Sequence, residues 1–246
     1  MEKQKTQLFN KINSEFITTD PEFVDIIKNF LQEEVLNAGN LSEKERMLCI
    51  LSVLLGCQGM EEYCYMLHVA LDSNIDPVAI KETVYQAAAY LGIGRISDYL
   101  LKTNEIMKEY GISLPLPAQS TTNRESRFEK GLAKQVELFG LQMADRQKDT
   151  GPRQNINHWL ASNCFGDYYT RNGLNDQERE MITFCFILAQ GGCENQLRGH
   201  TAGNFGVGND KEKLYQVVEQ CMPYIGYPRS LNAMSVIDEV AMKFEK

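Results

Sequence analysis

Histidine and cysteine are the side chains of this sequence whose types could carry chemistry, and they occur close together in two places. Cys64 precedes His68 by four positions, and Cys193 precedes His200 by seven. An imidazole near its ordinary pKa can take up or release a proton at neutral pH, whereas a thiolate is a nucleophile. The two pairs therefore point either to proton transfer or to thiol chemistry.

Helix geometry separates the two pairs. Residues four apart are neighbours on a helix surface, so His68 as an imidazolium would lower the pKa of the Cys64 thiol. Seven residues span roughly 10 Å along an ideal helix, so Cys193 and His200 cannot touch. Cys64 is thus the better candidate for a reactive thiol, although free cysteines are more often buried and inert.

Other polar and aromatic residues near His200 have more than one interpretation. Arg198 lies on the opposite side of the expected helix and pairs naturally with Glu194 at i, i+4, either as a surface ion pair or at the cavity of a neighbouring subunit. Trp159 could wall an apolar cavity or simply pack in the core. Glu180 falls in the first turn of a predicted helix, where a carboxylate complements the helix dipole.

Ligand spacings for a metal or cofactor are missing from the sequence. The three histidines form neither His-x-His nor His-Glu-x-x-His, and His158 has no cysteine, aspartate or second histidine at ligand spacing. Gly203, Gly206 and Gly208 follow a predicted helix instead of a strand, which is typical of a helix end and not of a phosphate loop. We expect no metal and no cofactor.

The elements that must position these residues occur twice in the chain. Arg46 precedes His68 by 22 positions and Arg179 precedes His200 by 21, so one insertion or deletion superposes the copies. Such self-similarity is typical of a tandem repeat. The recurring arginines could mark a contact between the repeats as easily as a site.

Nearly every segment of both copies has the pattern of a helix. Ser42 with Glu45, and Asn175 with Glu178, form predicted capping boxes before long apolar runs. No stretch alternates apolar and polar residues, so the prediction is an all-α fold of two tandem helical repeats. We expect a first repeat with N-terminal helices over residues 1–112, a Pro- and Ser-containing linker over 113–122, and a second repeat over 123–246.

Composition limits the partners. The formal net charge is -8 and the sequence contains no block of lysine or arginine, which argues against nucleic acid and anionic membranes. The seven cysteines show no paired spacing, and the polar N-terminus lacks the apolar region of a signal peptide. We expect a soluble, cytoplasmic protein that acts on a small molecule.

Four motifs stand out in the second copy. They are Phe165-Gly-Asp-Tyr-Tyr-Thr-Arg-Asn-Gly-Leu174, Glu178-Arg-Glu180, Gly192-Cys-Glu-Asn-Gln-Leu-Arg-Gly-His200 and Tyr224-Ile-Gly-Tyr-Pro-Arg-Ser-Leu-Asn-Ala233. Together they resemble the carboxymuconolactone decarboxylase family, whose helical core is shared with the alkylhydroperoxidase D group. The resemblance implies a histidine-bearing helix that lines a cavity at subunit contacts, and for a tandem copy it favours a homotrimer.

The decarboxylase branch of the family implies chemistry without cofactor or thiol. Glu194, Arg198 and His200 match its Glu-x-x-x-Arg-x-His spacing, so we expect His200 to act as acid or base on a small unsaturated carboxylate or lactone. Gln196 or Arg198 would hold the anion, because amide and guanidinium groups donate hydrogen bonds to negative charge. The residues expected to contact the substrate are Gln196, Glu194, Trp159 and Tyr224.

The peroxidase branch implies Cys-x-x-Cys-x-x-x-His, which neither copy completes. The second copy has Cys193 but Gln196 at the second cysteine, and the first has Glu61 and Cys64. Glu180 lies near the relay glutamate of that branch, one residue out of register. A thiol-dependent peroxidase using Cys64 with His68, or Cys193, is therefore the alternative function, and a non-catalytic small-molecule binder is a third.

Overall fold

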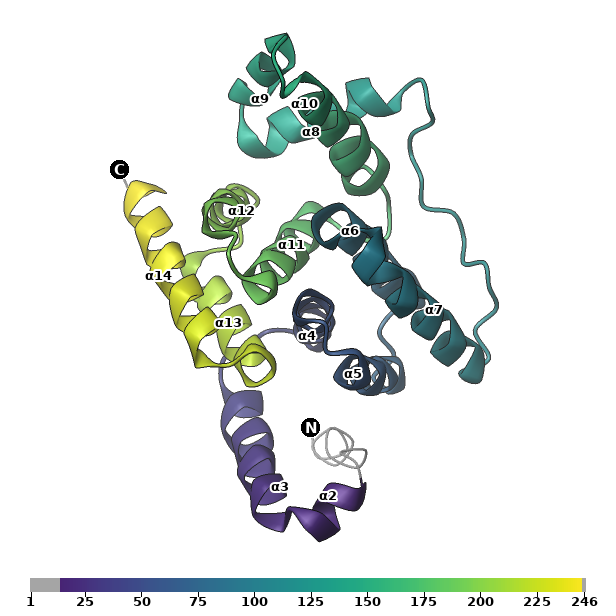
Figure 1. Ribbon diagram of the computed structural model, residues 1–246, viewed down its shortest axis with the longest axis vertical. Helices are drawn as coiled ribbons and strands as arrows, with labels where there is room; N and C mark the ends of the chain where they lie inside the picture. The colour runs from purple at the N-terminus through teal and green to yellow at the C-terminus, as the bar shows by residue number, and fades with distance from the viewer. Residues whose placement is uncertain (1–13, 245–246) are drawn as a thin grey trace.

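The computed structural model describes residues 14–244, which form helices and turns with no β-strand among them (Figure 1). The N-terminal helices are α2 (Ser14–Thr19), α3 (Pro21–Lys28), the π-helical η1 (Asn29–Glu34) and the 3₁₀ turn η2 (Val35–Asn37). The first half continues with α4 (Glu43–Cys57), α5 (Met60–Asp72), α6 (Pro77–Leu91) and α7 (Ile93–Glu109). The second half contains α8 (Arg127–Phe139), α9 (Gln142–Asp145), the 3₁₀ turn η3 (Arg146–Lys148), α10 (Gln154–Trp159), the π-helical η4 (Leu160–Tyr169), α11 (Asp176–Gln190), α12 (Glu194–Gly206), α13 (Lys211–Ile225) and α14 (Tyr227–Phe244). The predicted all-α fold class is confirmed.

The four core helices of each half follow the same order with nearly the same lengths. They have 15, 13, 15 and 17 residues in the first half and 15, 13, 15 and 18 in the second. The predicted capping boxes form at the starts of α4 and α11, since Ser42 and Asn175 each accept a hydrogen bond from the N3 backbone while the N3 glutamate reaches back. The correspondence is what a tandem repeat requires.

The helix bounds correct the alignment of the two copies. The starts of α4 and α11 differ by 133 positions, whereas those of α5 and α12 differ by 134. The extra residue of the second copy lies in the turn between its first two core helices. Met66 therefore occupies the place of His200, and the superposition of His68 on His200 is wrong.

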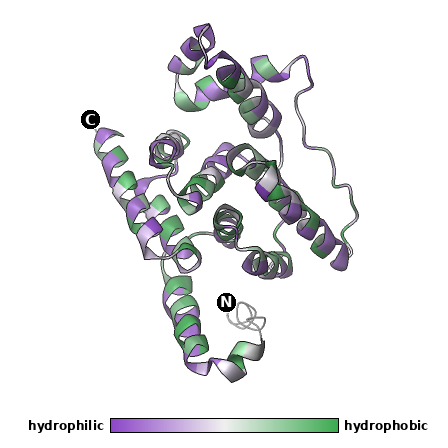
Figure 2. Ribbon diagram, viewed as in Figure 1, coloured by the Kyte–Doolittle hydropathy of each residue, from purple (hydrophilic) through white to green (hydrophobic). Residues whose placement is uncertain are grey.

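The central helices α4 and α11 pack against each other in the middle of the molecule, with α13 and α14 on one side and α6 and α7 on the other (Figure 1). Their middle turns are buried on all sides and consist mostly of apolar residues, because both helices are surrounded by others. Figure 2 colours apolar residues green. The exchange is reciprocal: α6 of the first half packs on α11, and α13 of the second half packs on α4. Each half thus completes the core of the other.

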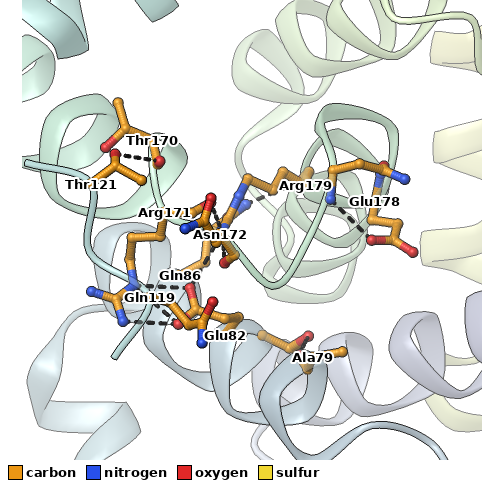
Figure 3. Close-up of polar contacts among 12 residues, drawn as sticks. Ala79, Glu82, Gln86, Gln119, Thr121, Thr170, Arg171, Asn172, Glu178 and Arg179 are labelled. Atoms are coloured by element: carbon orange, nitrogen blue, oxygen red, sulfur yellow. Dashed lines mark hydrogen bonds and ion pairs between the residues drawn. The ribbon is translucent and has the colours of Figure 1, made fainter. Parts of the chain in front are cut away.

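A buried ion cluster joins the two halves (Figure 3). Glu82 on α6 is 2% exposed and accepts from Nε of Arg171 at 3.0 and 2.9 Å, while Nη2 of Arg179 on α11 lies 3.3 Å from its Oε2. Arg179 also donates to Oε1 of Gln86 and to the carbonyl oxygens of residues 171 and 172. The recurring arginines could have marked either a contact between the repeats or a functional site. Arg179 forms a contact between the halves.

We expect Glu82→Gln to lower the free energy of unfolding by about 3–5 kcal/mol, because it leaves two arginines of the cluster without their buried counter-charge. Denaturant unfolding measures the effect. Glu105→Gln is the matched control, since Glu105 is 57% exposed and pairs with Lys102 on the surface; it should cost less than about 0.5 kcal/mol. Equal losses for both variants would contradict a structural role for the cluster.

Candidate active site

His200 is held against a buried carboxylate by the packing of α12 on α11. Its Nδ1 lies 2.9 Å from Oε2 of Glu180, which is 0% exposed. Asn204 donates to the carbonyl oxygens of both residues and ties the two helices together at this point. A Cβ on Gly203 would lie 2.4 Å from the same Oε2, so the close approach requires glycine at this position. The predicted candidates His200 and Glu180 therefore form one unit.

A hydrogen-bond chain extends from Glu180 into both halves. The hydroxyl of Tyr169, at the end of η4, donates to Oε1 of Glu180 at 2.8 Å and contacts the Thr183 hydroxyl at 2.8 Å. Tyr90 on α6 of the first half donates to the Tyr169 hydroxyl at 3.0 Å. Burial raises the pKa of both tyrosines well above the ordinary value, so both stay protonated as donors.

The His200 ring lines a cavity of about 610 Å³. It packs edge-on against Tyr90 and Phe139, with ring centroids 5.4 and 5.3 Å away. The walls are largely apolar and aromatic, with a few polar groups, which is typical of small-molecule sites. The lining residues are Ala89, Tyr90, Gln135, Phe139, Met143, Arg146, Leu160, Cys164, Phe165, Ile187, Gln190, Cys193, Asn195, Gln196, Gly199 and His200.

Three of the predicted site residues thus share one cavity, and a fourth supports it. His200, Cys193 and Gln196 lie in the wall, with Glu180 directly behind the imidazole. Cys193 is the residue before the first turn of α12, and Nε2 of Gln190 lies 3.1 Å from its sulfur.

Arg146 is the main residue that the sequence analysis missed. It is the only lysine or arginine in the cavity wall as described, and it comes from the 3₁₀ turn η3, which carries no recognisable motif. Tyr90 was also missed, because it comes from the other half of the chain. The Tyr-Tyr pair that ends with Tyr169 is part of a family-like motif, so that residue was within reach of the sequence.

Arg198 lies outside the cavity, on the opposite side of α12 as its spacing predicted. The expected ion pair with Glu194 is wrong: Nε of Arg198 donates to Glu239 on α14 at 2.7 Å and Nη1 to Asn195 at 3.3 Å. Glu194 is exposed and does not line the cavity. The donor role expected of Arg198 therefore has no support within this chain.

Trp159 and Tyr224 also lie away from the cavity. The indole of Trp159 is 54% exposed, and its neighbour Leu160 forms the wall instead. Tyr224 lies beside Met66, the residue of the first half that corresponds to His200, and its hydroxyl is 3.6 Å from the Met66 sulfur. The position matching Glu180 is the fully buried Met47, so this second place lacks the carboxylate.

The expected activation of Cys64 by His68 is wrong. Burial raises the pKa of the Cys64 thiol, and the nearby carboxylate of Glu61 raises it further. The His68 ring instead contacts Tyr110, the residue that follows α7, with Nδ1 3.4 Å from the hydroxyl. Both residues lie outside the cavity that contains His200.

Within residues 14–244, no group of three or more histidine, cysteine, aspartate or glutamate side chains is arranged to hold a metal ion. In the same part of the chain, no helix is both long enough and apolar enough to cross a membrane.

A comparison with solved structures agrees with the observed fold. The whole chain superposes on 98% of a crystal structure from Burkholderia xenovorans LB400, provisionally described as a gamma-carboxymuconolactone decarboxylase subunit, with a TM-score of 0.53 and 18% identity. At this identity the likeness concerns the fold alone. The chain therefore has the all-helical fold of that class of protein.

The sequence comparisons concern part of the chain. Residues 155–239 match the model of the carboxymuconolactone decarboxylase family. A 120-residue region, 48% of this chain, is 29% identical to 89% of the 4-carboxymuconolactone decarboxylase of Acinetobacter baylyi. The second half of the chain is therefore similar to the carboxymuconolactone decarboxylase family.

We expect the alkylation rate of Cys64 by iodoacetamide to rise about tenfold per pH unit from pH 7 to pH 9, because a thiol whose pKa is raised gains thiolate throughout this range. Peptide mass mapping at each pH measures the rate. An activated thiol would instead reach a constant rate below pH 8, and that result would restore Cys64 as a candidate nucleophile.

Proposed function

We propose that this protein is a cofactor-independent lyase that decarboxylates, or moves a proton within, a small unsaturated carboxylate or lactone. The observation that carries the proposal is the pair of His200 and the fully buried Glu180 at the wall of the cavity. The relative named as a decarboxylase supports the same reaction class, and residues 155–239, which match the family model, include this pair.

In this proposal the two imidazole nitrogens have separate tasks. Glu180 accepts from Nδ1–H and fixes the tautomer, as buried carboxylates do for other functional histidines. Nε2 has no partner among the described residues and remains for the substrate. The Tyr169 hydroxyl stabilises the carboxylate from its other oxygen.

A decarboxylation balances with these groups alone. The bond from carbon to the carboxylate breaks, carbon dioxide leaves, and the electron pair passes into a conjugated carbonyl as an enolate. The His200 imidazolium then gives its Nε2 proton to carbon, and the neutral imidazole regains a proton from solvent. Amide donors at the wall, such as Gln196 and Gln190, can stabilise the enolate oxygen.

Arg146 is the group in this cavity best suited to hold the substrate anion. Its guanidinium carries a permanent charge and offers several donors, whereas the rest of the wall is uncharged or apolar apart from His200. The anion-holding role that the sequence suggested for Gln196 or Arg198 therefore passes to Arg146 in this proposal.

Thiol chemistry gains no support from the cavity. Cys164 is the second thiol in the wall beside Cys193, and burial raises its pKa to about 12. It is therefore protonated at neutral pH and poorly suited to act as nucleophile or resolving thiolate.

We expect the protein to release carbon dioxide from 4-carboxymuconolactone, and we expect His200→Ala to lower kcat/KM by about 10²–10⁴-fold. In D₂O the product should contain deuterium at the carbon next to the lactone carbonyl, because protonation of the conjugated enolate there leaves the carbon that lost the carboxylate in the new double bond. His158→Ala is the matched control, because His158 stacks on Phe128 outside the cavity. Unchanged turnover in His200→Ala would reject its catalytic role, and saturable binding without turnover of any unsaturated lactone acid would favour the non-catalytic binder.

We expect Arg146→Gln to raise KM by roughly 10–100-fold, which corresponds to the loss of one charge-assisted hydrogen bond to the substrate anion. Steady-state kinetics on the same lactone measure the change. Arg198→Gln is the matched control and should leave KM unchanged, because that side chain bonds Glu239 outside the cavity. The reverse pattern would show that the Arg198 side of α12 contributes to a site, as it would if a neighbouring subunit's cavity used it.

A further inference from the structure

A second cavity, of about 460 Å³, lies between α6, α7 and the linker that joins the halves. The linker passes along these helices as an extended segment, visible at the edge of the molecule in Figure 1. Figure 3 shows three of the residues at this place, namely Glu82 from α6, Gln119 from the linker and Arg171 from the second half. The wall consists of Val78, Lys81, Glu82, Tyr85, Leu100, Asn104, Lys108, Leu114, Pro115, Leu116, Pro117, Ala118, Gln119 and Arg171.

Lys81 is the unusual member of this wall. The residue is only 6% exposed, and its ammonium donates to the side-chain oxygen of Asn104, its one polar partner among the described residues. Burial lowers its pKa. An ammonium has three donors and a full charge, and a buried charge is normally paired with an opposite one. Lys81 has neither a carboxylate partner nor acceptors for all three donors.

Glu82, the nearest acidic residue in the wall, does not supply that partner. Both of its oxygens accept from Arg171, and Arg179 approaches the second one. Lys108, exposed at the rim, adds another positive charge to the wall. The cavity is therefore locally positive within a chain whose formal net charge is -8.

Apolar residues also contribute to the wall. They are Leu100 of α7 and the leucine and proline residues of the linker, together with the ring of Tyr85. A wall that combines a buried cation with apolar side chains suits a ligand that carries both an anionic group and an apolar body. We propose that this cavity binds a small organic carboxylate, with the carboxylate at Lys81 and Lys108 and the apolar body against the linker.

This site is separate from the cavity that contains His200, and the inference does not depend on the proposed lyase activity. None of its residues lines the His200 cavity. Because its wall comes from both halves and the linker, a bound carboxylate would also hold the linker against α6 and α7.

Isothermal titration calorimetry with benzoate at low ionic strength tests the site. We expect saturable binding to the wild type and to His200→Ala, and at least tenfold weaker binding to Lys81→Met, which keeps the side-chain length without the charge. Benzyl alcohol, the uncharged analogue, should bind much more weakly than benzoate. Binding that disappears in His200→Ala, or that is unchanged in Lys81→Met, would overturn the proposal, as would binding of inorganic phosphate in place of benzoate.

Because Lys81 is buried, replacing it can affect folding as well as binding. A second pair of variants therefore changes exposed lysines. Lys108→Ala should weaken benzoate binding by about twofold to fivefold, since it removes an exposed charge at the rim. Lys102→Ala is the matched control on the same helix, because Lys102 pairs with Glu105 and lies outside the cavity. Equal affinities for the two variants would overturn the role of Lys108, and no saturable benzoate binding to the wild type would overturn the site.

Discussion

The buried ion pairing of Glu82 with Arg179 and Arg171 is the constraint on which the rest of this molecule depends. Glu82, Gln86 and Tyr90 follow one another at intervals of four residues, so they share one face of α6. Glu82 and Gln86 bind Arg179 at the start of α11, and Tyr90 then reaches Tyr169 beside Glu180. The contact that joins the halves thereby also sets the geometry around His200.

The two halves have the same arrangement of core helices but different side chains at the position of His200 and Glu180. Each half lends one tyrosine to the other: Tyr90 packs on His200, and Tyr224 packs on Met66 at the equivalent place. Only the second half has an imidazole and a carboxylate there, because the first half has methionine at both positions. The order and lengths of the core helices therefore recur in both halves, whereas the acid and base groups do not.

The part of the His200 cavity wall that comes from α8 and η4 depends on an unusually close contact between these two helices. A Cβ on Gly131 of α8 would lie 2.0 Å from the carbonyl oxygen of Ala161, and one on Gly166 of η4 would lie 2.1 Å from that of Arg127. The two backbones thus touch, which only glycine permits. The π-helical winding of η4 ends at Tyr169, and such segments are frequent at functional sites. The turn η3 follows α8 and α9 and brings Arg146 to the wall.

Local signals in the sequence determined the helices and the identity of the strongest site residue. Capping boxes at Ser42 and Asn175, apolar runs and turn residues act over a few positions, so α4, α11 and their successors could be predicted close to their observed bounds. His200 and its family-like motif were recognisable for the same reason. The division into domains and the homotrimer remain predictions, since they concern relations that the single chain does not test.

Tertiary structure alone decided which residues meet. Spacing along one helix placed Cys64 beside His68, but burial and Glu61 set the thiol pKa and Tyr110 took the imidazole. Spacing also predicted Glu194 as the partner of Arg198, whereas the observed partner, Glu239, lies on another helix. Arg146, Tyr90 and Glu180 reach the His200 cavity from three separate elements, and no periodicity within one segment encodes such a meeting. Side-chain types and helix periods are properties of the local chain, whereas the partners of a charge depend on how distant helices pack.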